Sequence, residues 1–432
     1  MSVADPGEAM SGNVDPLAPG HHLRILGRLA SPESVELRDF LTRNCVDYLW
    51  LDVDKDPLVQ YLGAASLDSV RLPVCVFPDG DVLEAPTRLE VARRVGLHTS
   101  PEHDVYDLTI VGGGPAGLTA AVYGASEGLR TLLIERDAPG GQAGTSSRIE
   151  NYLGFPEGLS GSELTGRALR QARRLGAEII VANSVAKADH SAGSPVPLEL
   201  DDGTTLETRA GIMATGVTYR TLDAPGAKEL TGKGVYYGAA PGEERFYEGC
   251  DVCAIGGGNS AGQAALNLAR LARSVTVVVR ADSLAKGMSH YLVERLESTP
   301  NVLIHLSSEV TLAEGEDRLE SIRIRGRESE AEQTVAVDAL FVLIGGEPQG
   351  DYAPSIRRDE RGFMLTGPDL MNEPGFAERW PLERAPHFLE TSWAGLLAAG
   401  DIRSGAVKRV ASAVGEGAMA VQLAHQVLQR SS

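Results

Sequence analysis

Short apolar runs alternate with longer amphipathic segments along most of this chain. Two stretches repeat one order: an apolar run, a glycine-rich turn, a helix-length segment and a second apolar run. The first stretch covers residues 107–135, and the second covers residues 252–280. Apolar strands that alternate with helices indicate βαβ units and a parallel sheet. The pattern therefore predicts an α/β fold with two Rossmann-like units that bind dinucleotides.

The turns of both units carry a dinucleotide-binding fingerprint. Its three motif positions are Gly112, Gly114 and Gly117 in the first unit, and Gly256, Gly258 and Ala261, with Ser260 between the last two, in the second. Glycines let the backbone approach a pyrophosphate, and the following helix N-terminus supplies N–H groups and a positive dipole. One such motif is weak evidence, but two in full context predict a flavin and a nicotinamide that exchange hydride.

The ends of the second strands differ between the two units. Glu135 ends the first unit and can accept hydrogen bonds from ribose hydroxyls, which suits the unphosphorylated adenosine of FAD. The second unit has Arg280 there, with Lys286 six residues later. A cation neutralises a 2′-phosphate, so the second site is predicted to bind NADPH. The alternative is that Arg280 is only a solvated charge.

Residues 23–97 predict a separate unit with the order β-α-β-α-β-β-α. This order resembles the thioredoxin/glutaredoxin fold, and Leu72-Pro73-Val74 lies where that family has its cis-proline. The place of the family's two cysteines is taken by Ser31-Pro32-Glu33-Ser34, with Ser31 as N-cap and Pro32 at the first helical position. Because serine cannot form a disulfide, dithiol exchange is lost. Cys45 and Cys75 are expected to be small buried residues, and the unit to serve docking or dimer contacts.

The domain organisation follows from the order of these units. We expect a disordered tail (1–22), the thioredoxin-like domain (23–97), a linker (98–104), an FAD domain in two parts (105–217 and 344–432) and an NADPH domain inserted between them (218–343). The two crossings between the dinucleotide domains both contain glycine, which marks them as a hinge. Residues 350–390 look longer than the fold requires and could cover the flavin or form a surface excursion.

Composition narrows the class of protein. A net charge of −19 argues against binding to nucleic acid or to anionic membranes. Four cysteines in 432 residues indicate a reducing, cytoplasmic setting, and the nine histidines show no metal-ligand spacing. No apolar run reaches the roughly 18 residues of a membrane span, and the acidic first 20 residues are no secretory signal.

From residue 105 to about residue 429 the chain resembles the low-molecular-weight thioredoxin reductases. The resemblance rests on GGGPAGLTAAVYGASEG, Gly140-Gly141-Gln142, Ile149-Glu150-Asn151-Tyr152, Ala214-Thr215-Gly216, GGGNSAGQAA and Ala399-Gly400-Asp401. It implies that FAD contacts Gly112, Gly114, Gly117, Glu135, Gln142, Asn151 and Asp401. It implies that NADPH is held by Gly258, Ser260, Ala261, Arg280 and Lys286, and we expect a homodimer. An alternative role for Asp401 is to cap a helix.

The chain departs from this family at the redox cysteines. The family's Cys-x-x-Cys aligns with Ala239-Ala240-Pro241-Gly242, which has no cysteine. In the nearby Cys250-Asp251-Val252-Cys253, Cys253 belongs to the strand that leads into the second glycine motif, and Cys250 belongs to the turn before that strand. Without a dithiol, reduced flavin must pass electrons directly to another acceptor. Glu243 could then act as a general acid, or it could belong to a solvated acidic turn.

Three functions remain open from the sequence. The favoured one is an NADPH-dependent FAD oxidoreductase whose acceptor is a small molecule, a protein carrier or O₂. The second is a flavin-dependent oxidase or dehydrogenase of a specialised pathway. The third is a flavin-based redox sensor.

Overall fold

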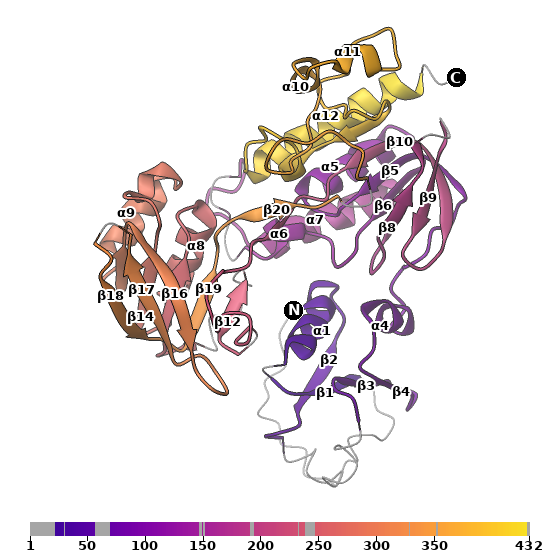
Figure 1. The fold of residues 1–432 in the computed structure, drawn as a ribbon. Helices are drawn as coiled ribbons and strands as arrows, with labels where there is room; N and C mark the ends of the chain where they lie inside the picture. The colour runs from indigo at the N-terminus through magenta and orange to yellow at the C-terminus, as the bar shows by residue number, and fades with distance from the viewer. Residues whose placement is uncertain are drawn as a thin grey trace. The chain divides into compact units, whose positions relative to one another are not determined.

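A computed structural model describes residues 22–29, 31–56, 70–146, 149, 152–190, 194–231, 233–237, 247–327, 329–350 and 353–429 (Figure 1). The chain divides into two compact units, Met1–Val95 and Gly96–Ser432. The predicted tail up to residue 21, most of the helix expected at 56–65, Asn151, and residues 239–243 lie outside the described residues.

The first unit is a four-stranded sheet with helices. Its elements are β1 (Leu23–Gly27), α1 (Pro32–Arg43), β2 (Tyr48–Asp52), β3 (Val74–Val76), β4 (Val82–Glu84) and α4 (Arg88–Arg94). The strand order is β2-β1-β3-β4, with β1 and β2 parallel and the other pairs antiparallel. The described strands and helices follow the predicted order, and the Leu72–Pro73 peptide is cis.

The start and end of α1 bear on two sequence predictions. Ser31 is the N-cap, as predicted: its hydroxyl oxygen accepts from the Ser34 N–H at 3.1 Å, and Pro32 follows at the first helical position. The prediction that Cys45 is buried is wrong. The helix runs to Arg43, and Cys45 turns the chain in a left-handed conformation (φ 57°) that leaves it exposed before β2 begins. Cys75 is buried in β3, as predicted.

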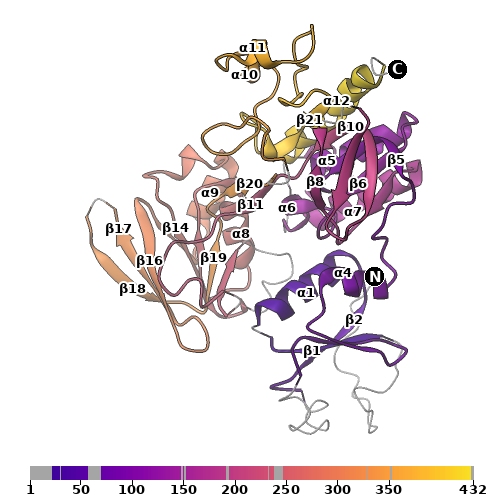
Figure 2. The same ribbon diagram turned by 45° about the vertical axis from the view of Figure 1, so that its right-hand side comes forward.

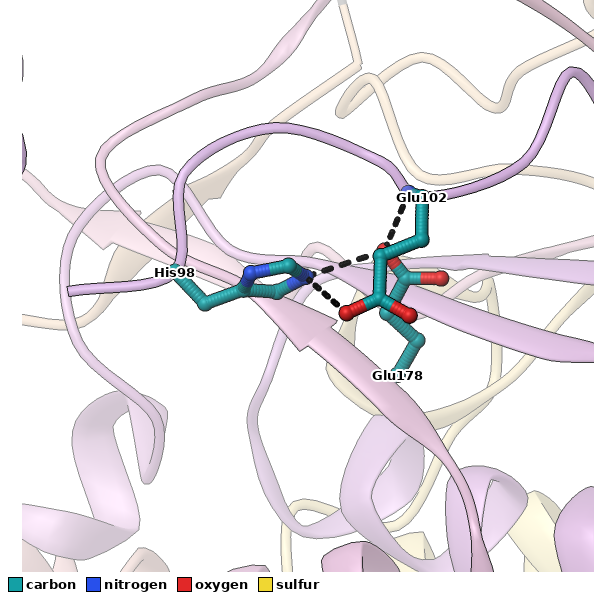
Figure 3. A group of neighbouring side chains, drawn as sticks. All are labelled: His98, Glu102 and Glu178. Atoms are coloured by element: carbon teal, nitrogen blue, oxygen red, sulfur yellow. Dashed lines mark hydrogen bonds and ion pairs between the residues drawn. The ribbon is translucent and has the colours of Figure 1, made fainter.

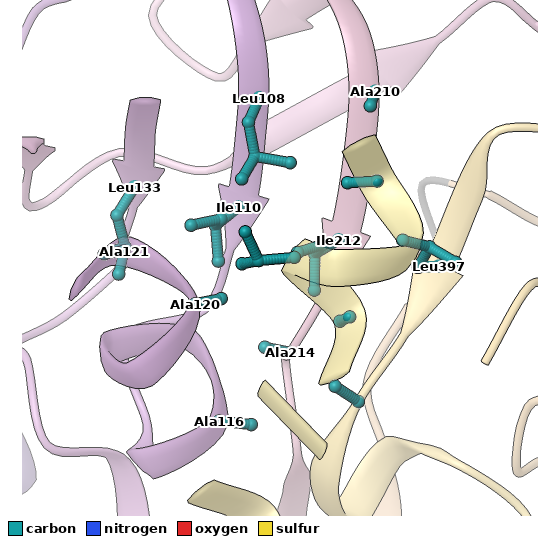
Figure 4. Packing of buried hydrophobic residues seen from close by; sticks show 14 of the residues in the cluster. Leu108, Ile110, Ala116, Ala120, Ala121, Leu133, Ala210, Ile212, Ala214 and Leu397 are labelled. Atoms are coloured by element: carbon teal, nitrogen blue, oxygen red, sulfur yellow. The ribbon is translucent and has the colours of Figure 1, made fainter. Parts of the chain in front are cut away.

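The second unit contains a seven-stranded sheet. Its main elements are β5 (Val105–Val111), α5 (Pro115–Ser126), β6 (Thr131–Ile134), α6 (Gly141–Gly144), α7 (Gly161–Leu175), β7 (Glu178–Ile180), β8 (Val185–Ala188), β9 (Val196–Leu200), β10 (Thr205–Met213), β21 (Leu396–Ala398) and α12 (Val410–Leu428). The path is β7-β6-β5-β10-β9-β8, and β21 also pairs with β10. Leu108 and Ile110 point from β5 into the core formed with α5 and α12 (Figure 4).

Between the two parts of this sheet lies an inserted domain. It comprises β12 (Val235–Tyr237), β13 (Asp251–Ile255), α8 (Asn259–Leu268), β14 (Ser274–Val278), the 3₁₀ helix η3 (Leu284–Lys286), α9 (His290–Ser298), β15 (Val302–His305), β16 (Ser308–Glu314), β17 (Ser321–Gly326), β18 (Glu332–Ala336) and β19 (Ala339–Val342). A parallel sheet of order β12-β19-β13-β14-β15 stands beside an antiparallel sheet, β16-β17-β18. The predicted Rossmann-like arrangement is therefore present.

The two crossings to the inserted domain pair with each other. β11 (Val217–Tyr219) and β20 (Gly346–Pro348) form an antiparallel two-stranded sheet (Figure 2). Gly216 and Gly345, which precede these strands, both have positive φ (64° and 91°). We call this pair of strands the crossing ribbon.

The chain after the crossing ribbon returns to the large sheet through short helices. These are α10 (Pro368–Met371), α11 (Phe376–Arg379) and the 3₁₀ helix η4 (Gly400–Ile402). The predicted long excursion is thus partly helical. In the part of the chain that the structure describes, no helix combines the length and apolar character needed to cross a membrane.

The expected linker is fixed to β7 by hydrogen bonds. Glu178 accepts from the Glu102 N–H at 2.7 Å, and its Oε1 lies 3.0 Å from His98 Nε2 (Figure 3). The Tyr106 hydroxyl also donates to Glu178, at 2.5 Å. His98, Glu102 and Glu178 are grouped closely enough to ligate a metal, which sequence spacing did not indicate. The hydrogen bonds between them account for the close grouping of these three side chains.

Candidate functional site

The first glycine turn is shaped by close backbone contacts. Gly112 has φ 106°, and a Cβ on Gly117 would fall 1.8 Å from the Gly112 carbonyl oxygen. Gly114 is the N-cap of α5 and supplies no capping side chain. The first N–H groups of α5 thus remain available to an anion. These residues fit the pyrophosphate of FAD, as the sequence predicts.

Glu135 lies at the end of β6 with its carboxylate against this turn. Its Oε2 accepts from the Gly113 N–H at 2.6 Å, and its Oε1 accepts from the Asp137 N–H at 2.9 Å. The residue is 8% exposed. These two bonds orient the Glu135 carboxylate at the first glycine turn, and a carboxylate there suits ribose hydroxyls as donors.

Asp401 in η4 supplies a second carboxylate to the first unit. Its side chain is half-buried and has no hydrogen-bond partner among the described residues. Burial raises the pKa of Asp401, and the charge of Lys408 opposes part of that increase. Lys408 Nζ donates to the Asp401 backbone oxygen at 2.5 Å. A desolvated carboxylate without a partner fits a ribityl or ribose hydroxyl, and it argues against helix capping.

Gln142 contacts the crossing ribbon. Its Nε2 donates to the Val217 carbonyl at 2.6 Å, which ties α6 to β11. Because the amide carries a second N–H and an oxygen in addition to this donor, a contact with FAD can use either a donor or an acceptor.

The second glycine turn repeats the first. Gly256 has φ 146°, and a Cβ there would fall 2.3 Å from the Leu343 carbonyl oxygen. Gly258 caps α8 without a side chain, and Ala261 is fully buried in the first turn of that helix, next to Ser260. The α8 N-terminus therefore offers a second dinucleotide site.

Arg280 belongs to a cluster of cations beside β14. Its Nε lies 3.7 Å from Glu309 Oε2. Arg325 Nη2 is 2.7 Å from Glu309 Oε1, and Arg327 Nε is 4.0 Å from Oε2. Arg327 Nη1 also donates to the Arg280 carbonyl at 3.5 Å. Three guanidinium groups thus meet beside β14, and their N–H groups suit a phosphate.

Lys286 lies at the end of η3, close to the second glycine turn. A Cβ on Gly287, the next residue, would fall 2.6 Å from the Gly257 carbonyl oxygen. Lys286 Nζ is 2.8 Å from Asp282 Oδ1, and both side chains are mostly exposed. The structure thus brings the loop of Lys286 to the glycine turn.

Cys250 and Cys253 pack against different cores. Cys253 is fully buried in β13 within the cluster that contains Leu340 and Val342. Cys250, just before β13, packs against the cluster on the other face of the strand, with Val252 and Ala254. Burial raises the pKa of both thiols. Both are therefore poor nucleophiles, and the packing role predicted for Cys253 agrees with its position.

Sequence reasoning missed Glu309, Arg325 and Arg327. They lie on β16, on β17 and directly after β17, about 30 to 50 residues from Arg280. No motif marks them, because the antiparallel sheet brings them to the end of β14. The alternation of arginine with isoleucine along β17, which puts Arg323 and Arg325 on one face, was an available signal.

Comparison with known proteins agrees with the fold. The family "pyridine nucleotide-disulphide oxidoreductase" matches residues 106–417. The thioredoxin reductase of Bacillus subtilis is 32% identical over 332 residues, which covers 74% of this chain and 94% of that protein. The family match spans both glycine turns.

Solved structures give the same result. Thioredoxin reductase from Lactococcus lactis superposes with a TM-score of 0.67 at 29% identity, covering 75% of this chain and 99% of that one. Thioredoxin reductase from T. acidophilum gives a TM-score of 0.66 at 27% identity, over 76% and 99% of the two chains. Thioredoxin reductases use FAD and NADPH, the two cofactors that the sequence predicts.

Proposed function

The chain belongs to the pyridine nucleotide-disulphide oxidoreductase family and is an NAD(P)H-dependent flavin oxidoreductase of the thioredoxin reductase type; we propose that its electron acceptor is not a disulfide. The reaction would consume NADPH and a proton and reduce the acceptor by two electrons. The acceptor is a small molecule, a protein carrier or O₂. When bound, FAD and NADPH supply the hydride chemistry.

The distribution of cysteines carries this proposal. The chain has four, and the segment that aligns with the family's redox pair, Ala239 to Gly242, has none. Cys250 and Cys253 contact opposite cores of β13, so they cannot meet each other or a flavin without disruption of the strand. Thiol chemistry needs contact near ~3–3.5 Å.

The names of the relatives favour the other outcome. The Bacillus subtilis protein is named a thioredoxin reductase, a function that requires a disulfide as acceptor. The relatives share the fold with this chain, and we infer that the fold serves the cofactors rather than the acceptor. We therefore assign the shared half-reaction, oxidation of NADPH, and propose a different second half-reaction.

Each cofactor has a proposed set of ligands in this chain. Gly112, Gly114, Gly117, Glu135, Gln142, Asn151 and Asp401 would hold FAD. Gly256, Gly258, Ser260, Ala261, Arg280 and Lys286 would hold NADPH. To the second set we add Arg327, because it shares Glu309 with Arg280 and donates to the Arg280 backbone. Its guanidinium would share the charge of the 2′-phosphate.

Three further proposals concern the rest of the chain. The first unit would be a thioredoxin-like domain without redox activity, since the Ser31 hydroxyl donates to Ser34 Oγ at 2.7 Å where the family has cysteines. It would serve docking or dimer contacts in a cytoplasmic homodimer.

Glu243 would donate a proton to the acceptor. Light scattering of the purified protein tests the dimer.

Anaerobic mixing with NADPH tests the proposed function. We expect rapid loss of flavin absorbance, and reoxidation by a quinone or by O₂. We expect no reduction of thioredoxin or of an aromatic disulfide at enzymatic rates. The Bacillus subtilis thioredoxin reductase serves as the positive control in the same disulfide assay. Slow bleaching without turnover would instead favour a redox sensor, and bleaching by an organic substrate alone would favour an oxidase.

The variants Cys250→Ser and Cys253→Ala separate packing from chemistry. Both should retain FAD and the rate of flavin reduction by NADPH, because neither thiol can reach the ring. Rapid disulfide reduction that either substitution abolishes would overturn the proposal and restore an ordinary disulfide reductase.

A further inference from the structure

The second glycine turn lacks the carboxylate that lies against the first. In the first unit a Cβ on Gly113 would fall 2.9 Å from Glu135 Oε2. In the second unit Val279 has that place, since a Cβ on Gly257 would fall 3.0 Å from Val279 Cγ1. A valine side chain cannot accept a hydrogen bond from a ribose hydroxyl. A carboxylate for this ribose must therefore come from another part of the chain.

Glu309 brings a carboxylate to the end of β14. The Ser308 N–H donates to the Val279 carbonyl at 3.0 Å, which fixes the start of β16 against that end. Glu309 Oε2 lies 3.7 Å from Arg280 Nε. The Glu309 side chain is 21% exposed, so it remains accessible from solvent. The second unit thus has a carboxylate beside Arg280, although it belongs to a different strand.

The two oxygens of this carboxylate have different surroundings. Oε1 accepts from Arg325 Nη2 at 2.7 Å, and Glu309 and Arg325 are opposite each other in the β16–β17 ladder. Oε2 accepts no hydrogen bond within the described part of the chain, because Arg280 Nε and Arg327 Nε are 3.7 and 4.0 Å away. Both distances exceed that of a hydrogen bond. Oε1 therefore anchors the side chain to the sheet, and Oε2 can accept from a ligand.

The neighbouring arginines keep this carboxylate ionised. The hydrogen bond from Arg325 is the main cause that lowers the pKa of Glu309, and the charges of Arg280 and Arg327 act in the same direction. Burial opposes them in part. A negative charge beside Arg280 repels a phosphate, whereas it strengthens a hydrogen bond from a hydroxyl.

The second cation assigned to the nucleotide also faces a carboxylate. Lys286 Nζ lies 2.8 Å from Asp282 Oδ1. Arg280 and Lys286 are thus each accompanied by an acid within the site. Because a carboxylate suits a free ribose hydroxyl and a cation suits a 2′-phosphate, this mixed set of charges suits a nucleotide with or without that phosphate.

We propose that Glu309 is a specificity-determining residue, through which the nucleotide site accepts NADH as well as NADPH. Glu309 Oε2 would accept from the 2′-hydroxyl of the adenosine ribose of NADH. Arg280 and Arg327 would bind the 2′-phosphate of NADPH against the repulsion of Glu309. The inference rests on the NADPH site proposed above, and it is independent of the electron acceptor.

Calorimetric titration of full-length, FAD-loaded protein with NADP⁺ and NAD⁺ tests this role. The oxidised nucleotides bind without reducing the flavin, and no electron acceptor is present. The native protein should bind both. Glu309→Gln keeps an oxygen for Arg325 but removes the charge. NADP⁺ should then bind roughly 1.4- to 5-fold more tightly, the value of one exposed charge contact. NAD⁺ should bind roughly 5-fold more weakly, because a charge-assisted hydrogen bond becomes a neutral one.

Glu314→Gln is the matched control on the same strand. Glu314 is the last residue of β16 and lies 3.9 Å from Arg323, so its substitution makes the same change of charge at the opposite end of the strand. Both affinities should stay at their native values. The proposal would be overturned by native protein that does not bind NAD⁺, by weaker or unchanged NADP⁺ binding in Glu309→Gln, by parallel changes for both nucleotides, or by an equal response of the control.

The variant Arg280→Ala, measured in the same titrations, separates the role of Glu309 from the site on which it depends. If Arg280→Ala loses NADP⁺ affinity and Glu309→Gln has native affinities, the role of Glu309 alone is refuted. If Arg280→Ala binds NADP⁺ as the native protein does, the assignment of the site is refuted, and this inference with it.

Discussion

Glu390→Gln should destabilise the FAD domain by about 3 kcal/mol. The carboxylate is fully buried and accepts four hydrogen bonds, two from Arg384 and two from backbone N–H groups. Breaking a buried ion pair costs ~3–5 kcal/mol because the remaining charge is left uncompensated. The Arg384 side chain is 19% exposed. Because water can solvate part of its charge, the lower end of this energy range applies.

Urea unfolding followed by tryptophan fluorescence measures this loss. Trp380 is a direct reporter, since its indole bonds to the Arg384 carbonyl. The control is Glu163→Gln, which breaks an ion pair with Arg167 (2.6 Å) that is about half exposed on both sides. Exposed pairs contribute ~0.2–1 kcal/mol. Equal losses for the two variants would refute the argument from burial.

The same pair predicts a pH dependence. Burial alone would raise the pKa of Glu390, but the bonds from Arg384, Gly395 and His387 lower it overall. The stabilisation is therefore fully present above the unfolded pKa of about 4.3, and it is lost as the pH falls through the lower folded pKa. The stability gap between native protein and Glu390→Gln should stay constant above about pH 5 and shrink in more acidic buffer. A gap that grows on acidification contradicts this sign.

Three further variants test the dinucleotide sites. Arg280→Ala and Arg327→Ala should each weaken NADPH binding roughly 10- to 150-fold, the value of one charge-assisted bond, and leave NADH nearly unchanged; equal losses for both nucleotides would mean a structural role. Titration calorimetry measures them, with Arg323→Ala as the control of equal charge, since Arg323 pairs with Glu314 and Glu332 instead. Gly117→Ala should lower FAD retention about tenfold or more, because its Cβ overlaps a carbonyl oxygen and overpacking costs ~1–3 kcal/mol. Absorbance after desalting measures the flavin, and Gly415→Ala, where a Cβ meets no atom within 4 Å, should retain it.

The parts of the fold that could be predicted are those encoded locally. The positive φ of Gly112 and Gly256 requires glycine, and both turns follow an apolar strand, so residue identity and spacing suffice to find them. Ser31 as an N-cap is equally local. The sequence signal for these features is local, although Gly256 also closely approaches the Leu343 carbonyl.

The parts that could not be predicted depend on distant segments. Arg327 reaches Arg280 only because the β16–β17 sheet folds against β14, and Glu178 meets His98 across 80 residues. The sequence predicts a buried Cys45 because it directly precedes the apolar run VDYLWLD, but Cys45 lies in the turn after α1, and β2 begins only at Tyr48. A single left-handed residue there reverses the burial expected from an apolar neighbourhood.

The crossing ribbon limits how the inserted domain can move. Three residue pairs join its strands, from Val217 with Pro348 to Tyr219 with Gly346. Paired strands resist extension, whereas two-stranded ribbons tolerate a wide range of twist. The inserted domain can therefore rotate about the axis of the crossing ribbon. It cannot move away from the large sheet while the two strands of the ribbon stay paired. A reorientation during turnover would be a rotation with one degree of freedom, and Gly216 and Gly345 would absorb its backbone change.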